Sequence, residues 1–196
     1  MYFSVATYRR NVAVAIAAFL FLCLLQTKGG LAAERGAPPA GEYQVKAAFV
    51  YNFIKFVSWP PGEDSPENAI KLCILGDLPD AAPFNDLEGQ EIIGKRLNIV
   101  QLREPRDGLT CQVLFLASSL SRRLTETLEI IRGRPILTIG DTDGYAQRGV
   151  MINMYLDKKR VRFEINTETA ETAGLRISSK LLSLAGTVHG PVKTGK

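Results

Sequence analysis

The stretch "CQVLFLASSLSRRLTETLEIIRGRPILTIGD", residues 111–141, holds the pattern that decides the fold. An almost wholly apolar run at 111–119 is followed by an amphipathic segment at 119–133 and a second apolar run at 135–141. Leucine and isoleucine side chains recur at helical spacing in the middle segment, and Gly133 ends the predicted helix. Apolar strands on both sides of a helix are typical of a parallel sheet that is buried on both faces.

The same pattern of strands continues on both sides of this unit. Further short runs, apolar or alternating, predict strands at 70–76, 96–102, 150–156 and 160–166. The last two are separated only by "DKK" and predict a hairpin, and the helical stretch that follows breaks near Gly174. We therefore predict a single-domain α/β layered sandwich, with a mostly parallel sheet and an antiparallel hairpin at residues 150–166.

A long helix is predicted at residues 42–59, which contain no internal glycine or proline and stop at Pro60-Pro61. Apolar residues of the helix occupy most of its circumference, so we expect it to be largely buried. Four aromatic side chains share one face at helical spacing: Phe49, Phe53, Phe56 and Trp59. We expect them to pack in the core, and a stripe that docks a partner is the alternative.

The chain begins with the features of a secretory signal peptide. Arg9 and Arg10 precede an apolar run at 12–25 that is too short to cross ~30 Å of hydrocarbon comfortably, and small residues follow it. We predict a signal peptide at 1–33 that is cleaved after Ala32 or Ala33, and a retained membrane anchor is the alternative. The rest of the chain divides into a flexible lead-in at 34–41, an α/β domain at 42–185 and a flexible tail at 186–196.

Removal of the predicted signal peptide leaves the chain almost neutral. Three of the 24 Lys and Arg residues lie in that segment (Arg9, Arg10 and Lys28), whereas none of the 20 acidic residues precedes Glu34. The mature chain therefore has 24 − 3 = 21 basic and 20 acidic residues, a net charge of +1 in place of +4. Nucleic-acid-binding proteins carry a basic footprint that this balance does not supply. We expect no nucleic-acid partner.

A search for catalytic motifs finds little. The single histidine, His189, lies in the predicted tail, where tertiary structure would not hold it for a catalytic triad. The chain has no H-E-x-x-H motif, no clustered cysteines, no G-x-S-x-G elbow, no P-loop and no dinucleotide glycine fingerprint. We expect no catalytic residue, no metal site and no cofactor.

The segment "GDTDG", residues 140–144, weakly resembles a calcium loop but lacks the further spaced oxygens and the closing glutamate. Asp141 and Asp143 follow a predicted buried strand, where aspartates serve mainly in turns and helix caps. The loops at the carboxyl ends of sheet strands are also where α/β domains bind ligands. A ligand pocket that includes Asp141 to Tyr145 is therefore the alternative.

The predicted strand "RVRFEIN", residues 160–166, has an apolar and a polar face. The polar face carries four side chains: Arg160, Arg162, Glu164 and Asn166. A solvated sheet surface with cross-strand ion pairs explains them most simply. A surface that binds a partner or a ligand is the alternative, and catalysis is a weaker one because no nucleophile or base is evident nearby. Asn166, followed by Thr167, also suits the N-cap of the next helix.

Two cysteines, Cys73 and Cys111, remain once the signal peptide is removed. Export to an oxidising compartment favours a disulfide between them, which requires that their two predicted strands be neighbours in the sheet. A pair of buried free thiols is the alternative.

Taken together, six segments of the chain resemble the YfiR family. They are "YQVKAAFVYNFIKFVSWP", "LCILG", "CQVLFLASS", "PILTIGD", "GVMINMYLDKKRVRFEIN" and "GLRISSKLLSLA", in that order from about Glu42 to Ala185. The chain departs from the family pattern where Val150 follows Gly149 in place of a second glycine, and in having one mature cysteine pair where some relatives have two. The resemblance suggests the same pairing of Cys73 with Cys111.

The resemblance implies a periplasmic regulatory protein and no enzymatic activity. Such proteins bind the periplasmic sensor region of an inner-membrane diguanylate cyclase and repress the synthesis of cyclic-di-GMP. In such systems an outer-membrane lipoprotein sequesters the repressor and releases the cyclase, and a homodimer is a further assembly left open. A periplasmic small-molecule sensor and a cryptic hydrolase are the alternative functions.

Overall fold

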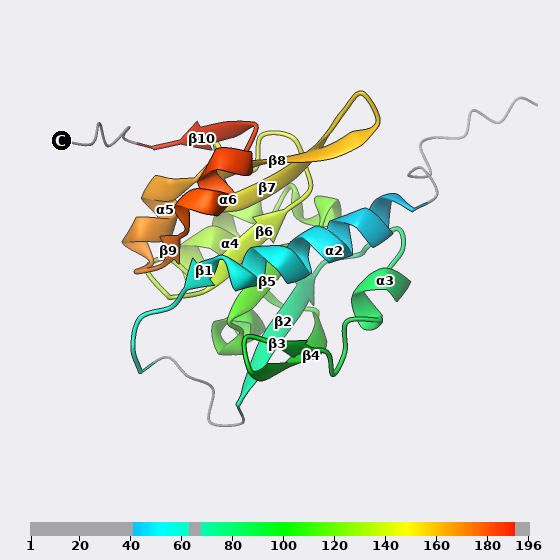
Figure 1. The fold of residues 1–196 in the computed structure, drawn as a ribbon, viewed down its shortest axis with the longest axis vertical. Coiled ribbons are helices and arrows are strands. Elements are labelled where there is room, and N and C mark those ends of the chain that lie inside the picture. The colour runs from blue at the N-terminus through cyan, green and yellow to red at the C-terminus, as the bar shows by residue number, and fades with distance from the viewer. Residues whose placement is uncertain (1–40, 63–67, 191–196) are drawn as a thin grey trace, which may run out of the picture. The chain divides into compact units, whose positions relative to one another are not determined.

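The computed structural model describes residues 41–62 and 68–190, which are organised by an eight-stranded sheet (Figure 1). The strands of this sheet are β2 (Ala69–Leu75), β3 (Glu91–Ile92), β4 (Lys95–Leu102), β5 (Val113–Leu116), β6 (Leu137–Gly140), β7 (Ile152–Asp157), β8 (Arg160–Asn166) and β10 (Thr187–His189). A separate ribbon pairs β1 (Val57–Ser58) with β9 (Arg176–Ile177). The helices are α2 (Glu42–Lys55), α3 (Ala82–Asn85), α4 (Leu124–Ile130), α5 (Thr167–Thr172) and α6 (Ser179–Leu184), with 3-10 turns at Pro105–Thr110 and Ser118–Leu120.

The order of strands across the sheet is β10-β8-β7-β6-β5-β2-β4-β3. The five strands from β7 to β4 in this order run parallel to one another. β8 returns antiparallel beside β7, and β10 then pairs parallel with β8. At the opposite edge, β3 is antiparallel to β4. The predicted α/β fold with a mostly parallel sheet and an antiparallel hairpin is therefore confirmed.

The two faces of the sheet carry separate layers of the core. On β2, Leu72 and Ile74 belong to one cluster of buried side chains, whereas Cys73 and Leu75 belong to the other. The first cluster includes residues of α2 and the second includes Leu124 of α4, and Figure 1 shows these two helices on opposite sides of the sheet. Because both faces are covered, the central strands are apolar at nearly every position.

The predicted helix at 42–59 ends earlier than expected, at Lys55. Phe56 leaves the helical conformation, and the next two residues form β1, in which Val57 pairs with Ile177 of β9. β1 and β9 are each only two residues long, so they leave no periodic signal in the sequence. Phe53 is 1% exposed and its ring lies 4.9 Å from that of Phe163, which confirms core packing for this residue. The other three aromatic residues are partly buried against the same core.

Two further predictions on the secondary structure are wrong in part. The helix expected at 119–133 is reduced to α4, because the serines at its start form a 3-10 turn in which Ser121 Oγ donates to Ser118 O. The tail expected from residue 186 begins instead with β10, which is fixed beside β8 and whose His189 carbonyl accepts from Thr167 Oγ1. The break near Gly174 is confirmed, since Gly174 has φ +74° and separates α5 from β9.

Other predictions fall on parts of the chain that the structure does not describe. The signal peptide with its cleavage at Ala32 or Ala33, nearly all of the lead-in at 34–41 and the last residues of the tail lie outside the described residues. Each of these stays a prediction.

A disulfide joins Cys73 and Cys111, with their Cα atoms 6.0 Å apart. Cys73 lies in β2, and Cys111 directly follows the 3-10 turn that leads into β5. β2 and β5 are neighbours in the sheet, so the geometric condition for the predicted bond is met and the alternative of two free thiols is wrong. The bond lies in the core layer that contains α4.

We predict that replacing both cysteines, Cys73→Ala with Cys111→Ala, lowers the free energy of unfolding by about 4 kcal/mol. The bond closes a segment of 38 positions and so restricts the conformations of the unfolded chain. Its loss removes this restriction and favours the unfolded state. Urea denaturation of the mature domain measures the change, and reduced unaltered protein is the matched control. If the double variant, the reduced protein and the oxidised protein unfold at the same urea concentration, the bond contributes no stability.

Candidate functional site

The loop at residues 141–149 follows β6 at the carboxyl end of the parallel strands, the usual ligand-binding edge of an α/β sheet. Gly140, the last residue of β6, is required for the path of this loop. A Cβ atom at Gly140 would lie 2.7 Å from the ring of Tyr145 and 3.0 Å from Asn153 Oδ1. The loop therefore packs directly on the end of β6, which brings its side chains close to β7 and β8.

Asp141 enters a buried cluster of charges with the start of α2. Its side chain is 1% exposed and accepts hydrogen bonds from Lys46 Nζ at 2.8 Å and from the Tyr43 hydroxyl at 2.9 Å. Lys46 Nζ also lies 2.5 Å from Glu42 Oε1, one helical turn earlier. Asp141 was expected to serve a turn or a helix cap, and that interpretation is wrong because its carboxylate binds α2 instead.

The surroundings of Tyr43 favour its neutral form. Burial, and after it the neighbouring Asp141 carboxylate, raises the pKa of Tyr43 well above its usual value. The cluster thus contains two carboxylates, one ammonium group and a hydroxyl that keeps its proton. It fixes the first turn of α2 across the end of β6.

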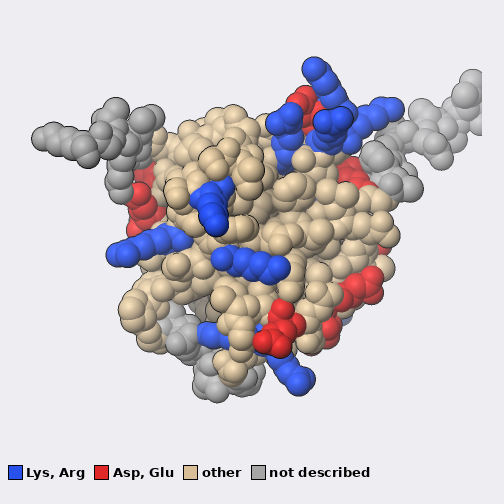
Figure 2. All heavy atoms as spheres, in the orientation of Figure 1, with Lys and Arg blue, Asp and Glu red and all other residues tan. Residues whose placement is uncertain are grey.

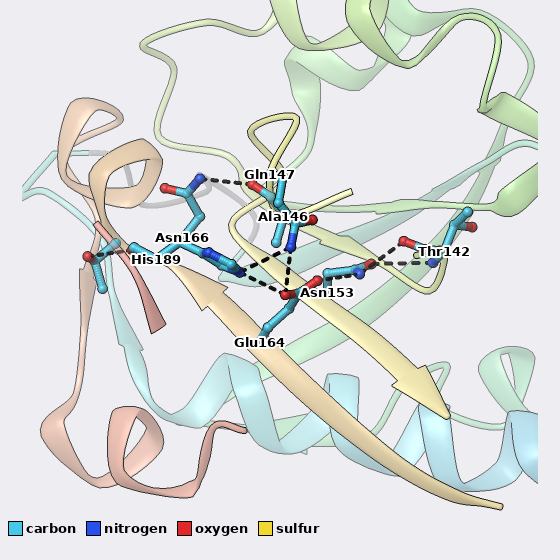
Figure 3. A network of polar contacts seen from close by, with 8 residues as sticks. Thr142, Ala146, Gln147, Asn153, Glu164, Asn166 and His189 are labelled. Atoms are coloured by element: carbon cyan, nitrogen blue, oxygen red, sulfur yellow. Dashed lines mark hydrogen bonds and ion pairs between the residues drawn. The ribbon is translucent and has the colours of Figure 1, made fainter. Parts of the chain in front are cut away.

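A second polar network surrounds Glu164, the buried carboxylate on β8 (Figure 3). Asn153 Nδ2 donates to Glu164 Oε1 at 3.0 Å, and Gln147 Nε2 donates to Oε2 at 3.1 Å. His189 Nε2 lies 2.7 Å from the same Oε2. Asn153 also bonds both backbone groups of Thr142, so the network joins β7, β8 and β10 to the loop at 141–149.

Asn166 completes the attachment of the loop. Its Oδ1 accepts from the backbone N–H of Thr169 at 3.0 Å, and its Nδ2 donates to the carbonyl of Ala146 at 2.9 Å. The first contact is the N-cap of α5 that the sequence predicted. The second contact ties the same side chain to the loop.

The polar face of β8 therefore divides into two halves. Arg160 and Arg162 are exposed, and Arg162 Nε lies 3.1 Å from Asp157 Oδ2 across the hairpin. Glu164 is buried and Asn166 is partly buried, so a solvated face is the wrong description for this half. The reason is tertiary: β10 and the loop at 141–149 cover the end of β8, whereas its first residues extend into the free hairpin (Figure 1).

The seven residues proposed as a partner or ligand site do not form one site. Tyr145 is buried in the core layer that contains α4, and its hydroxyl donates to the Ala117 carbonyl and lies 3.1 Å from Ser121 Oγ. Asp143 is exposed. Several side chains that were not predicted for the site contact the predicted residues, among them Tyr43 and Lys46 at Asp141, and Gln147, Asn153 and His189 at Glu164. Of these residues, the sequence pattern indicates a contact only for Lys46, because it lies four residues after Glu42 in a mostly apolar helix.

The arrangement is that of a rigid scaffold with exposed surfaces. Across residues 41–62 and 68–190, no group of three or more His, Cys, Asp or Glu side chains is placed to hold a metal ion. In the same part of the chain, no helix is both long and apolar enough to cross a membrane. Most polar side chains of the two networks contact one another, whereas the hairpin and the outer face of α2 present exposed side chains.

We predict that Lys46→Met lowers the free energy of unfolding by about 3–5 kcal/mol, because it leaves two buried carboxylates without their cation. Arg162→Met is the matched control. It breaks an ion pair with Asp157 in which both side chains are about half exposed, and should cost less than about 1 kcal/mol. Chemical denaturation of both variants measures the two changes. If both lower the free energy of unfolding by the same small amount, the buried cluster contributes no more stability than an exposed ion pair.

We further predict that Tyr43 makes the stability of the domain depend on alkaline pH. In the unfolded chain Tyr43 ionises near pH ~10, whereas in the folded chain its pKa is raised. Its contribution is therefore complete below pH ~10 and is lost as the pH rises toward the folded pKa. The stability gap between the unaltered protein and Tyr43→Phe should narrow above pH ~10 in urea titrations, and a constant gap would contradict the prediction.

Comparison with known proteins adds a family and a fold. A solved structure described as a conserved domain protein from Vibrio cholerae O1 biovar El Tor str. N16961 matches with a TM-score of 0.51 and 12% identity, over 72% of this chain. The ABC domain in complex with L-Trp from Streptococcus pneumonia matches with a TM-score of 0.48 and 9% identity, over 70% of this chain and 58% of that one. The chain covers only 59% of the Vibrio structure, and at 12% identity this likeness concerns the fold alone.

The family model described as YfiR/HmsC-like matches residues 43–186. This range includes every strand of the large sheet except β10, together with both polar networks apart from His189 and the Glu42 end of the buried cluster. The chain therefore belongs to the YfiR/HmsC-like family, a family of periplasmic regulators in the control of diguanylate cyclases.

Proposed function

We propose that this protein represses an inner-membrane diguanylate cyclase by binding its periplasmic sensor region, and so lowers cyclic-di-GMP. The observation that carries the proposal is the family match over residues 43–186, nearly the whole described part of the chain. An outer-membrane lipoprotein that sequesters the repressor is a second proposed partner, and a homodimer is a proposed assembly. The signal peptide at 1–33, cleaved near Ala32 or Ala33, would deliver the domain to the periplasm.

The disulfide supports this compartment. Cys73 and Cys111 are paired in the core, and structural disulfides persist mainly in oxidising compartments such as the bacterial periplasm. A protein that folds around this bond gains stability after export. The site of folding and the site of the proposed action therefore coincide.

The polar side chains support a binding function better than a hydrolytic one. Among the described residues, the side-chain contacts of His189 go to Glu164 and Gln147, and a hydrolase would need a nucleophile within reach of this ring. The carboxylate of Glu164 in turn contacts three side chains of the same network. Each group is used to hold the loop at 141–149.

A small-molecule sensor is a second candidate function, favoured by a cavity of about 260 Å³ between α4 and α5. Apolar side chains that include Ile136 and Met151 line it, and Arg132 and Arg148 also border it. Asp141 and Tyr145, proposed for such a pocket, are not among its lining residues. A ligand that stays bound through purification of the mature domain would favour this function over the first.

Deletion of the gene should raise cellular cyclic-di-GMP in a strain that expresses the cognate cyclase. Expression of the complete chain should restore the lower level, whereas a form without residues 1–33 should not, because it stays on the wrong side of the inner membrane. Nucleotide extraction and mass spectrometry measure the three strains. Unchanged cyclic-di-GMP in the deletion strain would count against the repressor.

A further inference from the structure

A groove of about 520 Å³ runs between the first turn of α2 and the β7–β8 hairpin. Its apolar lining consists of Val45 from α2 with Leu156 and Val161 from the hairpin, and its charged lining consists of Glu42, Lys159 and Arg160. Val45 is 45% exposed and Leu156 is 47% exposed, so two large apolar side chains face solvent across the groove. Exposed apolar side chains that line one continuous hollow mark a binding surface more often than scattered ones do.

The outer face of α2 continues this surface without charge. A second hollow of about 320 Å³ follows the helix past Val45, over Ala48 and Asn52. The exposed positions of α2 before its last residue are Gln44, Val45, Ala48 and Asn52. A surface helix normally carries charged residues on its solvent side, and the depletion of charge is typical of the centre of a protein interface.

The tip of the hairpin, in contrast, is strongly basic. Residues 157–162 contain two lysines, two arginines and one aspartate, which gives this short stretch a net charge of +3. Figure 2 shows these cations clustered beside the mostly uncharged face over α2. Lys158 and Lys159 form the turn with φ values of 48° and 65°, a left-handed conformation that is unfavourable for residues with a side chain and that Asn-Gly adopts more easily. The turn thus contains two lysines at positions where the backbone conformation favours asparagine and glycine.

We propose that this groove and the basic turn together bind an acidic, amphipathic segment of the periplasmic region of the cyclase. Apolar side chains of the segment pack against Val45 and Leu156, and its carboxylates pair with Lys158 and Lys159. The apolar residues line a hollow, whereas binding to a membrane surface requires apolar residues that protrude, so a protein segment fits better than a lipid headgroup layer. This inference rests on the proposed function and assigns it a surface.

Titration of the purified mature domain with the purified periplasmic region of the cognate cyclase tests the surface. Val45→Asp should weaken binding at least about tenfold, because it places a charge in the apolar groove. Lys158→Glu with Lys159→Glu should weaken it by a similar factor at low salt and by less at high salt, since salt screens exposed charges. Leu109→Asp is the matched control: Leu109 is 42% exposed, lies outside the groove, and its replacement should leave affinity within about twofold.

The outcomes separate the inference from the proposed function. If the unaltered domain binds and the groove variants bind equally well with unchanged melting temperatures, the surface is wrong and the repressor proposal stands. If the unaltered domain does not bind, both fail.

A photo-reactive amino acid placed at position 45 identifies the occupant in cells. A cross-link to the cyclase supports the inference. A cross-link to a second copy of the chain or to its own residues 34–40 would overturn it. Co-sedimentation of the domain with vesicles of equimolar phosphatidylethanolamine and phosphatidylglycerol, if abolished by the same variants, would also overturn it.

Discussion

The buried contact between Lys46 and Asp141 fixes the first turns of α2 at the end of β6, next to the proposed binding surface. Lys46 is drawn inward to meet Asp141 at the end of β6, and Glu42 follows to pair with the same ammonium group. Both charged residues of the first helical turns are thereby removed from the solvent side. What remains on the outer face of α2 is uncharged up to Lys55. A buried ion cluster that contributes to the scaffold thus also leaves a helix surface suited to protein contact.

β8 is part of the buried scaffold at one end and is exposed to solvent at the other. Glu164 and Asn166 hold the loop at 141–149, and β10 covers this end of the strand. These contacts fix the base of the hairpin, so the turn at Lys158 and Lys159 is carried by a rigid ladder between β7 and β8. A basic tip on a fixed base presents its charges in one direction. Such a tip loses less conformational freedom on binding than a flexible loop would.

The sequence was sufficient for the features that depend on local pattern. Apolar runs located the central strands and the hairpin, and the disulfide followed from two cysteines in predicted strands. The features that it missed depend on contacts between distant residues. β1 and β9 are too short to show a period, and Glu164 is buried because β10 returns beside it more than 20 residues later. The role of Asp141 required knowledge that α2 crosses the end of β6, which lies about 95 positions away in the chain.

In the proposed mode of binding, the specificity of this protein lies in these surfaces rather than in its sheet. The Vibrio structure shares the fold at 12% identity while extending well beyond the matched region, and a fold of this kind supports many unrelated functions. Substitutions inside the two core layers act on stability and change binding only through it. Substitutions at Val45, Leu156 or the lysine turn touch side chains that are already exposed, so they can alter partner choice at little cost to the fold. In the proposed mode of binding, the groove and the hairpin tip are therefore the places where different cyclase partners would be distinguished.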